Sequence, residues 1–101
     1  MKNEINRVGK QTIVMINGQM DTLRAKEFER NIRPWLQYER PEVCIDCSEL
    51  QYVNSNGMRV FMTLLKYVRG MGGKLFFTKM QPEVKYIFDM TGFLTFVNKG
   101  K

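Results

Sequence analysis

Short apolar runs and apolar stripes at helical spacing alternate along this chain, and their order restricts the fold more than any other property of the sequence. Runs typical of strands cover 4–8, 12–17, 43–47, 74–78 and 93–97. Helical patterns begin near Asp21, after residue 54 and at Pro82. This order predicts an opening hairpin followed by strand–helix–strand units. We expect an α/β sandwich, with a mixed, mostly parallel sheet and helices packed against it.

Proline and glycine set the expected ends of the three helices. Asp21 or Thr22 can cap the first helix, and Pro34 should kink or stop it because proline lacks a backbone donor. The second helix should end in the glycine-rich segment 70–73, and the third at Gly92.

The length and composition fit one folded domain over residues 1–101. The chain has 101 residues, of which 44% are hydrophobic and 26% are charged. The longest run without Asp, Glu, Lys or Arg is Gln11–Met20, about half the length of a bilayer-spanning helix, so no membrane span is expected. The charged residues within Met1–Lys10 argue against a secretory signal. We therefore expect a cytoplasmic protein.

The sequence contains no histidine, which removes the most frequent general base and the catalytic arrangements that depend on it. Cys44 and Cys47 have the C-x-x-C spacing of thiol oxidoreductases, but they lie in a predicted strand. Residues three apart on a strand face opposite sides and lie about 10 Å apart, beyond disulfide reach. Two soft ligands are also too few for a zinc site. We expect no catalytic residue, no metal and no cofactor.

The net charge of +6 comes entirely from the second half of the chain. Residues 1–55 carry eight basic and eight acidic side chains, whereas residues 56–101 carry eight basic and two acidic ones. Five basic residues precede the first acid of that half: Arg59, Lys66, Arg69, Lys74 and Lys79. Such a stretch can face an acidic protein, a nucleotide or a nucleic acid, or it can simply be solvated. No nucleic-acid recognition motif accompanies it, so we expect no direct nucleic-acid binding.

The segment 54–57, Asn-Ser-Asn-Gly, leads directly into an apolar stripe at helical spacing. Each of its three small polar side chains can cap the start of a helix. Met58 and Met62 lie four apart on the first turns of that helix, so they share a face and can offer an adaptable binding surface.

The run 44–58, CIDCSELQYVNSNGM, resembles the central signature of the STAS domain family, typified by bacterial anti-sigma factor antagonists. In that family a strand ending in an Asp-x-Ser segment leads to a D-S-S-G loop and a helix, and the first Ser of the loop is the phosphoacceptor. Here Asp46 and Ser48 match the strand, Ser55 takes the acceptor position and Gly57 matches the Gly. The resemblance covers nearly the whole chain, with further matches at 16–18, 21, 72–74, 82–84 and 92–93.

Two positions depart from the family's loop, since Asn54 replaces its Asp and Asn56 its second Ser. A negative charge and an alternative hydroxyl beside Ser55 are therefore absent. The resemblance implies a non-enzymatic switch that binds an anti-sigma factor serine kinase when unphosphorylated, so that a sigma factor is freed for transcription. Phosphorylation of Ser55 would release the kinase, and a serine phosphatase would reverse the modification. The expected switch loop is Asn54, Ser55, Asn56 and Gly57, and the expected partner interface is Asp21, Met58, Arg59 and Met62.

Three alternatives stay open at this point. Ser55 can be a plain cap of the following helix rather than a phosphoacceptor. The chain can act as a constitutive STAS subunit of a transporter or signalling assembly without phosphorylation, which Asn54 and Asn56 favour. It can also bind a nucleotide or a nucleic acid through its basic second half.

Overall fold

The computed structural model describes residues 3–92 and 98–99, and that part of the chain forms five strands and four helical segments. The strands are β1 (Asn3–Val8), β2 (Gln11–Met20), β3 (Glu42–Val53), β4 (Lys74–Thr78) and β5 (Asn98–Lys99). The helical segments are α1 (Thr22–Ile32), the short 3-10 helix η1 (Arg33–Leu36), α2 (Ser55–Gly70) and α3 (Pro82–Thr91).

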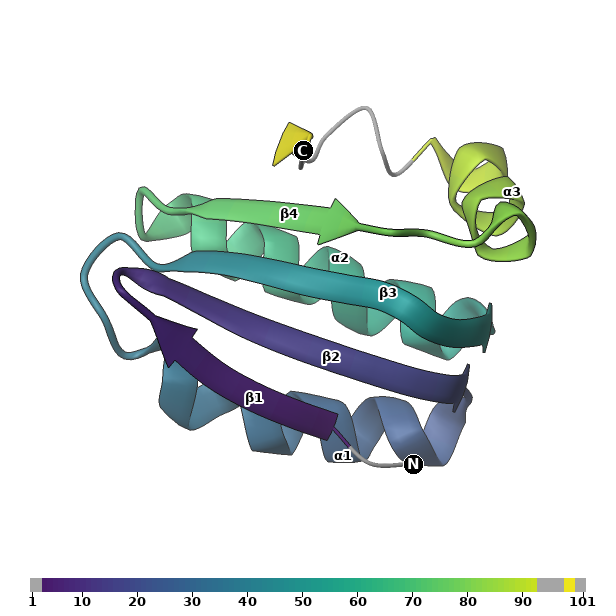
Figure 1. Cartoon of the computed structure of the whole chain (residues 1–101), viewed down its shortest axis with the longest axis horizontal. Coiled ribbons are helices and arrows are strands. Elements are labelled where there is room, and N and C mark those ends of the chain that lie inside the picture. Colours follow the sequence, from purple (N-terminus) through teal and green to yellow (C-terminus); the bar gives the residue numbers. More distant parts are fainter. Residues whose placement is uncertain (1–2, 93–97, 100–101) are drawn as a thin grey trace.

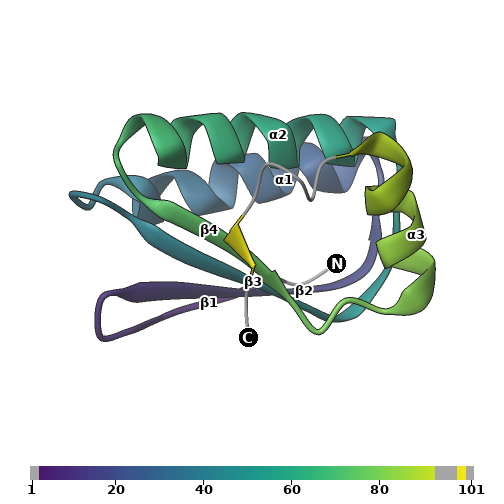
Figure 2. The same ribbon diagram turned by 90° about the horizontal axis from the view of Figure 1, so that it is seen from above.

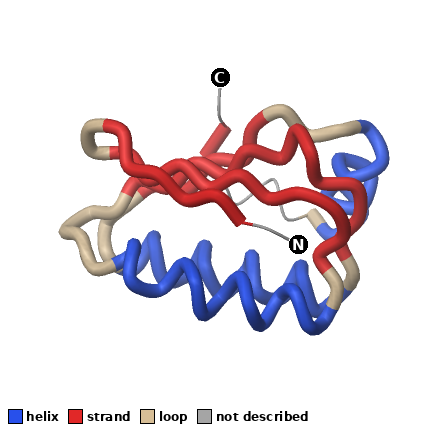
Figure 3. The backbone as a smooth tube through the Cα atoms, turned by 60° about the horizontal axis from the view of Figure 1, so that its bottom comes forward, coloured by secondary structure: helices blue, strands red, loops and turns tan. Residues whose placement is uncertain are grey.

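The five strands form one sheet in the order β1-β2-β3-β4-β5 (Figure 1). β1 and β2 form the expected antiparallel hairpin, and all other neighbouring strands are parallel. α1 and α2 lie side by side over one face of the sheet, and α3 lies at the end where β3 finishes (Figures 1 and 2). Figure 3 shows the resulting layers of strands and helices. The predicted α/β sandwich with a mostly parallel sheet is confirmed.

Pro34 and Gly92 end their helices as predicted. α1 stops at Ile32 and the chain continues as η1, because Pro34 cannot supply a backbone donor to an α-helix. Gly92 follows α3 with a φ of +70°, in the left-handed region that favours glycine. The last strand predicted at 93–97 lies outside the described residues, and the strand described beside β4 is β5.

β2 and β3 extend beyond their predicted ends because their pairing continues through two bulges. The register between them shifts after Met15 and again after Gly18, and each shift places one extra residue in β3. The inward-facing residues in the second half of β3 are consequently three apart, at Cys47, Leu50 and Val53. The alternation of apolar and polar residues stops at the first bulge, so it predicts only the first half of β3.

Four phenylalanine rings join the three helices to the sheet. The ring of Phe61 in α2 is fully buried, and its centroid lies 5.7 Å from that of Phe28 in α1. It lies 5.2 Å from the ring of Phe77 in β4. The ring of Phe88 in α3 lies 5.9 Å from Phe61 and 5.3 Å from Phe77. Contacts of this kind contribute about 0.5–1.5 kcal/mol each beyond the burial of area, so they fix α2 relative to α3.

The two cysteines occupy β3 as the sequence predicted and are free thiols. Cys47 is fully buried, and burial, together with the nearby Asp46 and Cys44, raises the pKa of its thiol to about 12. Cys44 is half-buried, with its Sγ 3.7 Å from the Thr78 Oγ1. A raised pKa argues against thiolate chemistry at Cys47.

Gly73 permits a close approach between two backbone segments. A β-carbon at this position would overlap the carbonyl oxygen of Pro41, whereas one at Gly70 would meet no atom within 4 Å. We predict that Gly73→Ala lowers the free energy of unfolding by about 1–3 kcal/mol, because the backbone must shift to relieve the overlap. The matched control Gly70→Ala should change it by less than about 1 kcal/mol. Urea unfolding of both variants tests this, and equal destabilisation would contradict it.

Candidate functional site

β2 and β3 end together at one corner of the molecule, from which α1 and α2 begin. Met20 pairs with Val53 at the ends of these strands, and the backbone N–H of Asn54 donates to the Met20 carbonyl oxygen over 3.1 Å. A β-carbon on Gly57 would lie 2.6 Å from the Met20 Cγ and 2.8 Å from the Val53 Cγ1. The first turn of α2 is therefore packed directly against the ends of both strands, and only glycine fits at residue 57.

Side-chain hydrogen bonds cap both helices and join their starts. The Asp21 carboxylate accepts a backbone N–H from the first turn of α1 over 3.0 Å. The Asn54 side-chain oxygen accepts the Gly57 N–H over 2.9 Å, so Asn54 is the cap of α2 among the three candidates. The Asn56 side-chain amide donates to the Thr22 hydroxyl oxygen over 2.7 Å. The amide that stands in place of the family's second Ser thus links α1 to α2.

Ser55 is the first residue of α2, and its side chain is exposed. Within residues 3–92 and 98–99, its hydroxyl has no hydrogen-bond partner. Because Asn54 caps the helix instead, the interpretation of Ser55 as a plain cap is wrong. The hydroxyl is accessible to another protein at the N-terminus of a 16-residue helix.

An apolar groove of about 480 Å³ borders Ser55 between the end of β3, the start of α2 and α3. Three of its lining side chains are large and exposed, namely Tyr52 at 47%, Tyr86 at 66% and Met90 at 70%. Exposed apolar surface that gathers in one hollow is typical of an interaction site. The groove and the Ser55 hydroxyl therefore form one continuous candidate surface.

The sequence pattern does not mark Tyr52, Tyr86 and Met90 as site residues, because it does not show that α3 lies beside the start of α2. The spacing of Tyr86 and Met90, four apart on one helix, was the available signal. The predicted interface residues differ in their exposure to solvent. Arg59 is exposed and Met62 is half-buried. Met58 is only 9% exposed and lines the groove rather than the outer side of α2.

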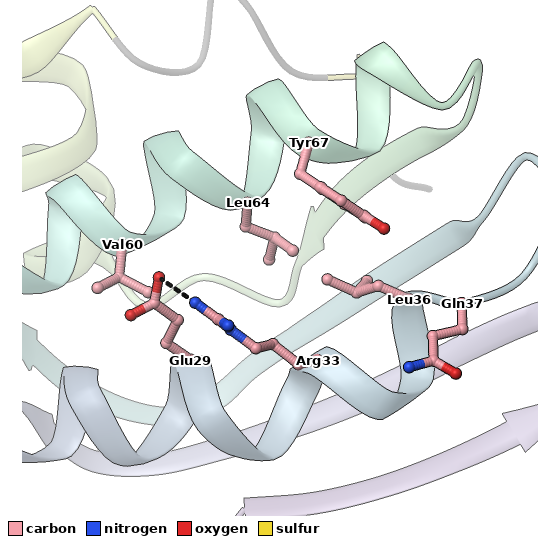
Figure 4. Close-up of a pocket in the computed structure, with 7 residues that line it drawn as sticks. All are labelled: Glu29, Arg33, Leu36, Gln37, Val60, Leu64 and Tyr67. Atoms are coloured by element: carbon pink, nitrogen blue, oxygen red, sulfur yellow. Dashed lines mark ion pairs between the residues drawn. The ribbon is translucent and has the colours of Figure 1, made fainter.

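A second groove, of about 420 Å³, lies between α1 and α2 (Figure 4). Apolar side chains that include Val60 and Leu64 line it, and an exposed ion pair of 3.9 Å joins Arg33 to Glu29 at its edge. Exposed pairs of this kind contribute about 0–1 kcal/mol.

The five basic residues that precede the first acid of the second half separate into two groups. Arg59, Lys66 and Arg69 are exposed on α2, which contains no acidic residue. Lys74 and Lys79 belong to the β4 region and lie near acids of β3: Lys74 is paired in register with Glu42, and the Lys79 Nζ lies 3.9 Å from the Asp46 Oδ2. Lys79 thus has an acid partner, whereas no carboxylate among the described residues is paired with Arg59, Lys66 or Arg69.

Asp46 is a half-buried carboxylate at the first bulge of β3. Its Oδ1 accepts the Ser48 N–H over 2.9 Å. Burial raises the pKa of this carboxyl, but the hydrogen bonds from the Ser48 backbone and hydroxyl and the charge of Lys79 outweigh it, and the pKa lies below its usual 3.8. The Asp-x-Ser segment of the sequence is thus a structural element that stabilises the bulge leading β3 to the corner.

Comparison with known families identifies the fold and its relatives. The sequence profile of the STAS domain family matches residues 1–100. The chain belongs to the STAS domain family. Its relatives include BtrV of Bordetella bronchiseptica, assigned provisionally as an anti-sigma factor antagonist, which is 25% identical over 95 residues, or 94% of this chain and 82% of BtrV. The anti-sigma-B factor antagonist of Staphylococcus epidermidis is 26% identical over 89 residues, or 86% of this chain and 82% of that protein.

Solved structures of anti-sigma factor antagonists superpose on most of this chain. Unphosphorylated SpoIIAA, an anti-sigma factor antagonist, gives a TM-score of 0.82 at 12% identity, covering 99% of this chain and 89% of SpoIIAA. An anti-sigma factor antagonist of Mycobacterium paratuberculosis gives a TM-score of 0.82 at 16% identity, covering 97% of this chain and 83% of that protein. At these identities the likeness shows the shared fold.

The STAS antagonists are non-catalytic, and the chain is a STAS domain related to them. In the described part of the chain, no group of three or more Cys, Asp or Glu side chains is placed to hold a metal ion. None of the helices in residues 3–92 is long and apolar enough to cross a membrane.

The lowered pKa of Asp46 gives the fold a defined dependence on pH. A carboxyl whose pKa is lowered by folding stabilises the native state above its unfolded pKa, and this contribution is lost as the pH falls through the folded-state value. We predict that between about pH 4.5 and pH 2 wild type loses stability more steeply than Asp46→Asn. Glu49→Gln, at an exposed position of the same strand, is the matched control. Urea unfolding across this range tests the prediction, and parallel curves for wild type and Asp46→Asn would refute it.

Proposed function

We propose that this STAS domain is an anti-sigma factor antagonist that binds a serine-kinase anti-sigma factor while Ser55 is unmodified and releases it when Ser55 is phosphorylated. The observation that carries the proposal is the exposed Ser55 hydroxyl, which has no hydrogen-bond partner among the described residues and lies beside an apolar groove. The switch would regulate sigma-factor-dependent transcription, and a serine phosphatase would restore the binding form.

The position of Ser55 suits phosphoryl transfer from ATP bound to the partner. The Ser55 oxygen would attack the γ-phosphorus as the bond to ADP breaks, and the hydroxyl proton would pass to a base of the kinase. Because Asn54 rather than Ser55 caps α2, this reaction removes no capping bond. The N-terminus of a helix also favours a nearby anion. The fold can therefore accept the phosphate without rearrangement.

The names of the relatives support this assignment. The Staphylococcus relative is an anti-sigma-B factor antagonist, and SpoIIAA has been solved in an unphosphorylated and a phosphorylated form. The phosphorylated form of SpoIIAA has the same fold as this chain, with a TM-score of 0.75. A fold that persists in both forms is consistent with a switch that acts on the contact surface rather than on folding.

The groove explains how one phosphate can release a partner. Phosphorylation adds about −1.5 to −2 charges at neutral pH. On Ser55 this charge would stand at the edge of the apolar groove, where a bound partner excludes water. An anion that loses water in an apolar contact is disfavoured, because the desolvation cost of the charge can exceed the attraction to a nearby cation. A penalty of about 3 kcal/mol would weaken binding about a hundredfold, which is sufficient for a switch.

Phosphorylation of Ser55 can be tested with the anti-sigma factor kinase obtained by affinity purification with the unmodified protein. Incubation with this kinase and ATP should add one phosphate to wild type and none to Ser55→Ala, as measured by mass spectrometry. Ser55→Asp should weaken binding about tenfold or more by calorimetry, because it places a negative charge at the groove. Retention of the phosphate on Ser55→Ala, or unchanged binding by Ser55→Asp, would overturn the assignment.

Tyr86 and Met90 should contribute to the same contact. Exposed aromatic side chains at an apolar groove are frequent anchors of binding energy. We predict that Tyr86→Ala with Met90→Ala weakens binding to the kinase at least about tenfold with little change in stability. Tyr67→Ala is the matched control, since Tyr67 is 46% exposed and lines the α1–α2 groove instead. Equal binding by the double variant and wild type would exclude this groove from the contact.

A constitutive role in an assembly is the second candidate. It is favoured by Asn54 and Asn56, whose side chains bond to Gly57 and Thr22 and supply neither the acid nor the second hydroxyl of the family's loop. Stable association with transport or signalling subunits, without a kinase and without phosphate on Ser55, would establish this role in place of the switch.

A further inference from the structure

One side of α2 carries a continuous row of side chains that begins at the proposed phosphoacceptor. Ser55, Arg59, Met62, Lys66 and Arg69 are spaced by four, three, four and three residues, which places them along one stripe of a helix. We call this row the α2 stripe. Ser55 and its three cations are exposed, and Met62 is half-buried. The cations extend over about 15 Å along the helix axis.

The charge of the α2 stripe is not matched within the molecule. The ion pairs in the described part of the chain join Arg33 to Glu29, Lys79 to Asp46 and Lys85 to Asp89. In residues 3–92 and 98–99, no carboxylate is paired with Arg59, Lys66 or Arg69. α2 also contains no acid in its 16 residues. The stripe is therefore an exposed positive surface that a partner with negative charge can complement.

An acidic protein surface fits this arrangement better than a nucleic acid. The stripe offers three cations beside a half-buried Met62, and at its Ser55 end it continues into the apolar groove lined by Tyr86 and Met90. Nucleic-acid affinity depends on neutralising many phosphates, whereas protein interfaces combine an apolar centre with a charged rim. The groove supplies the apolar centre, and the stripe supplies the rim.

We propose that the α2 stripe docks on an acidic surface of the anti-sigma partner through Arg59, Lys66 and Arg69, and that a phosphate on Ser55 withdraws Arg59 from that surface. This inference rests on the proposed function and names the chemistry by which the partner is held and released.

The withdrawal of Arg59 follows from its place on the helix. Residues four apart on a helix have neighbouring side chains, and an anion N-terminal to a cation is the more favourable order. A phosphate on Ser55 therefore has the Arg59 guanidinium within reach, and guanidinium binds phosphate oxygens in a two-pronged geometry. Phosphorylation of Ser55 then adds negative charge that faces an acidic partner. The phosphate also pairs with Arg59, so one of the three cations no longer binds the partner. Both effects weaken the same contact.

Binding of the purified kinase measures the docking part of the proposal. The triple variant Arg59→Glu, Lys66→Glu and Arg69→Glu should bind at least about thirtyfold more weakly than wild type at low salt. Raising sodium chloride from about 50 mM to 500 mM should weaken wild-type binding and affect the triple variant little. Lys10→Glu, on the β1–β2 turn, tests the same reversal of charge away from the stripe, and should bind within about twofold of wild type.

The outcomes separate this inference from the proposed function. Wild type that binds the kinase while the triple variant binds equally well would overturn the acidic docking surface and leave the proposed function intact. Failure of wild type itself to bind would overturn both. Binding of unrelated duplex DNA by wild type that is lost in the triple variant would assign the stripe to a nucleic acid and overturn the inference.

A measurement without the partner tests the Arg59 part. Phosphoserine is incorporated at residue 55 during synthesis, and phosphorus NMR follows the second ionisation of its phosphate. Arg59→Gln should raise the pKa of this step by about half a unit, because the guanidinium favours the doubly charged form. Lys10→Gln should leave it unchanged, and Asp21 and Arg24 of the neighbouring helix start are common to every variant. An equal pKa in wild type and Arg59→Gln would overturn the withdrawal of Arg59.

Discussion

The candidate site depends on one junction, the hydrogen bond from the Asn54 backbone to the carbonyl oxygen of Met20. It ties the end of β3 to the end of β2, so that both following helices start at the same corner. Gly57 lets the first turn of α2 pack against Met20 and Val53 with no room for a β-carbon. Asn56 then bonds across to Thr22. Backbone and side-chain contacts thus hold Ser55 at a fixed, exposed position.

The aromatic cluster extends this constraint to the groove. Phe61, two turns into α2, contacts rings from α1, β4 and α3. Since Phe88 anchors α3 on its inner side, Tyr86 and Met90 are left exposed beside the start of α2. The same packing that stabilises the core therefore places an apolar hollow next to the Ser55 hydroxyl. The position of Ser55 and the apolar groove beside it therefore depend on the same packing around Phe61.

Local patterns predicted most of the fold, because strands and helices here differ clearly in apolar spacing. The helix ends at Pro34 and Gly92 were also predictable, since proline lacks the backbone donor of an α-helix and glycine readily adopts the left-handed conformation that ends one. The second half of β3 was not, because the bulge that Asp46 stabilises changes the spacing of buried residues. The role of the loop 54–57 as the candidate site was predicted from the resemblance to the STAS family. The residue that caps α2 could not be predicted. Three polar residues in a row can each cap a helix, and only coordinates show that Asn54 does so.

The groove and the division of the basic residues also required the tertiary structure. Lys74 and Lys79 look continuous with Arg59 in the sequence, yet they lie near the acids of β3. Three of the five cations, Arg59, Lys66 and Arg69, therefore lie along the single helix α2, and Lys74 and Lys79 lie apart from them in the β4 region. On α2 the cations form a row along the helix that begins next to Ser55.

The amide at residue 56 limits the number of hydroxyl groups that the loop 54–57 offers for phosphorylation. Because Asn56 is engaged with Thr22 and has no hydroxyl, the segment 54–57 offers a kinase one acceptor oxygen. Under the proposed function this loop would then have two states, modified and unmodified, with no doubly modified form. The fraction in the binding state would follow the ratio of kinase to phosphatase activity as a simple graded response, and any threshold behaviour would have to arise in the proteins that act on this one.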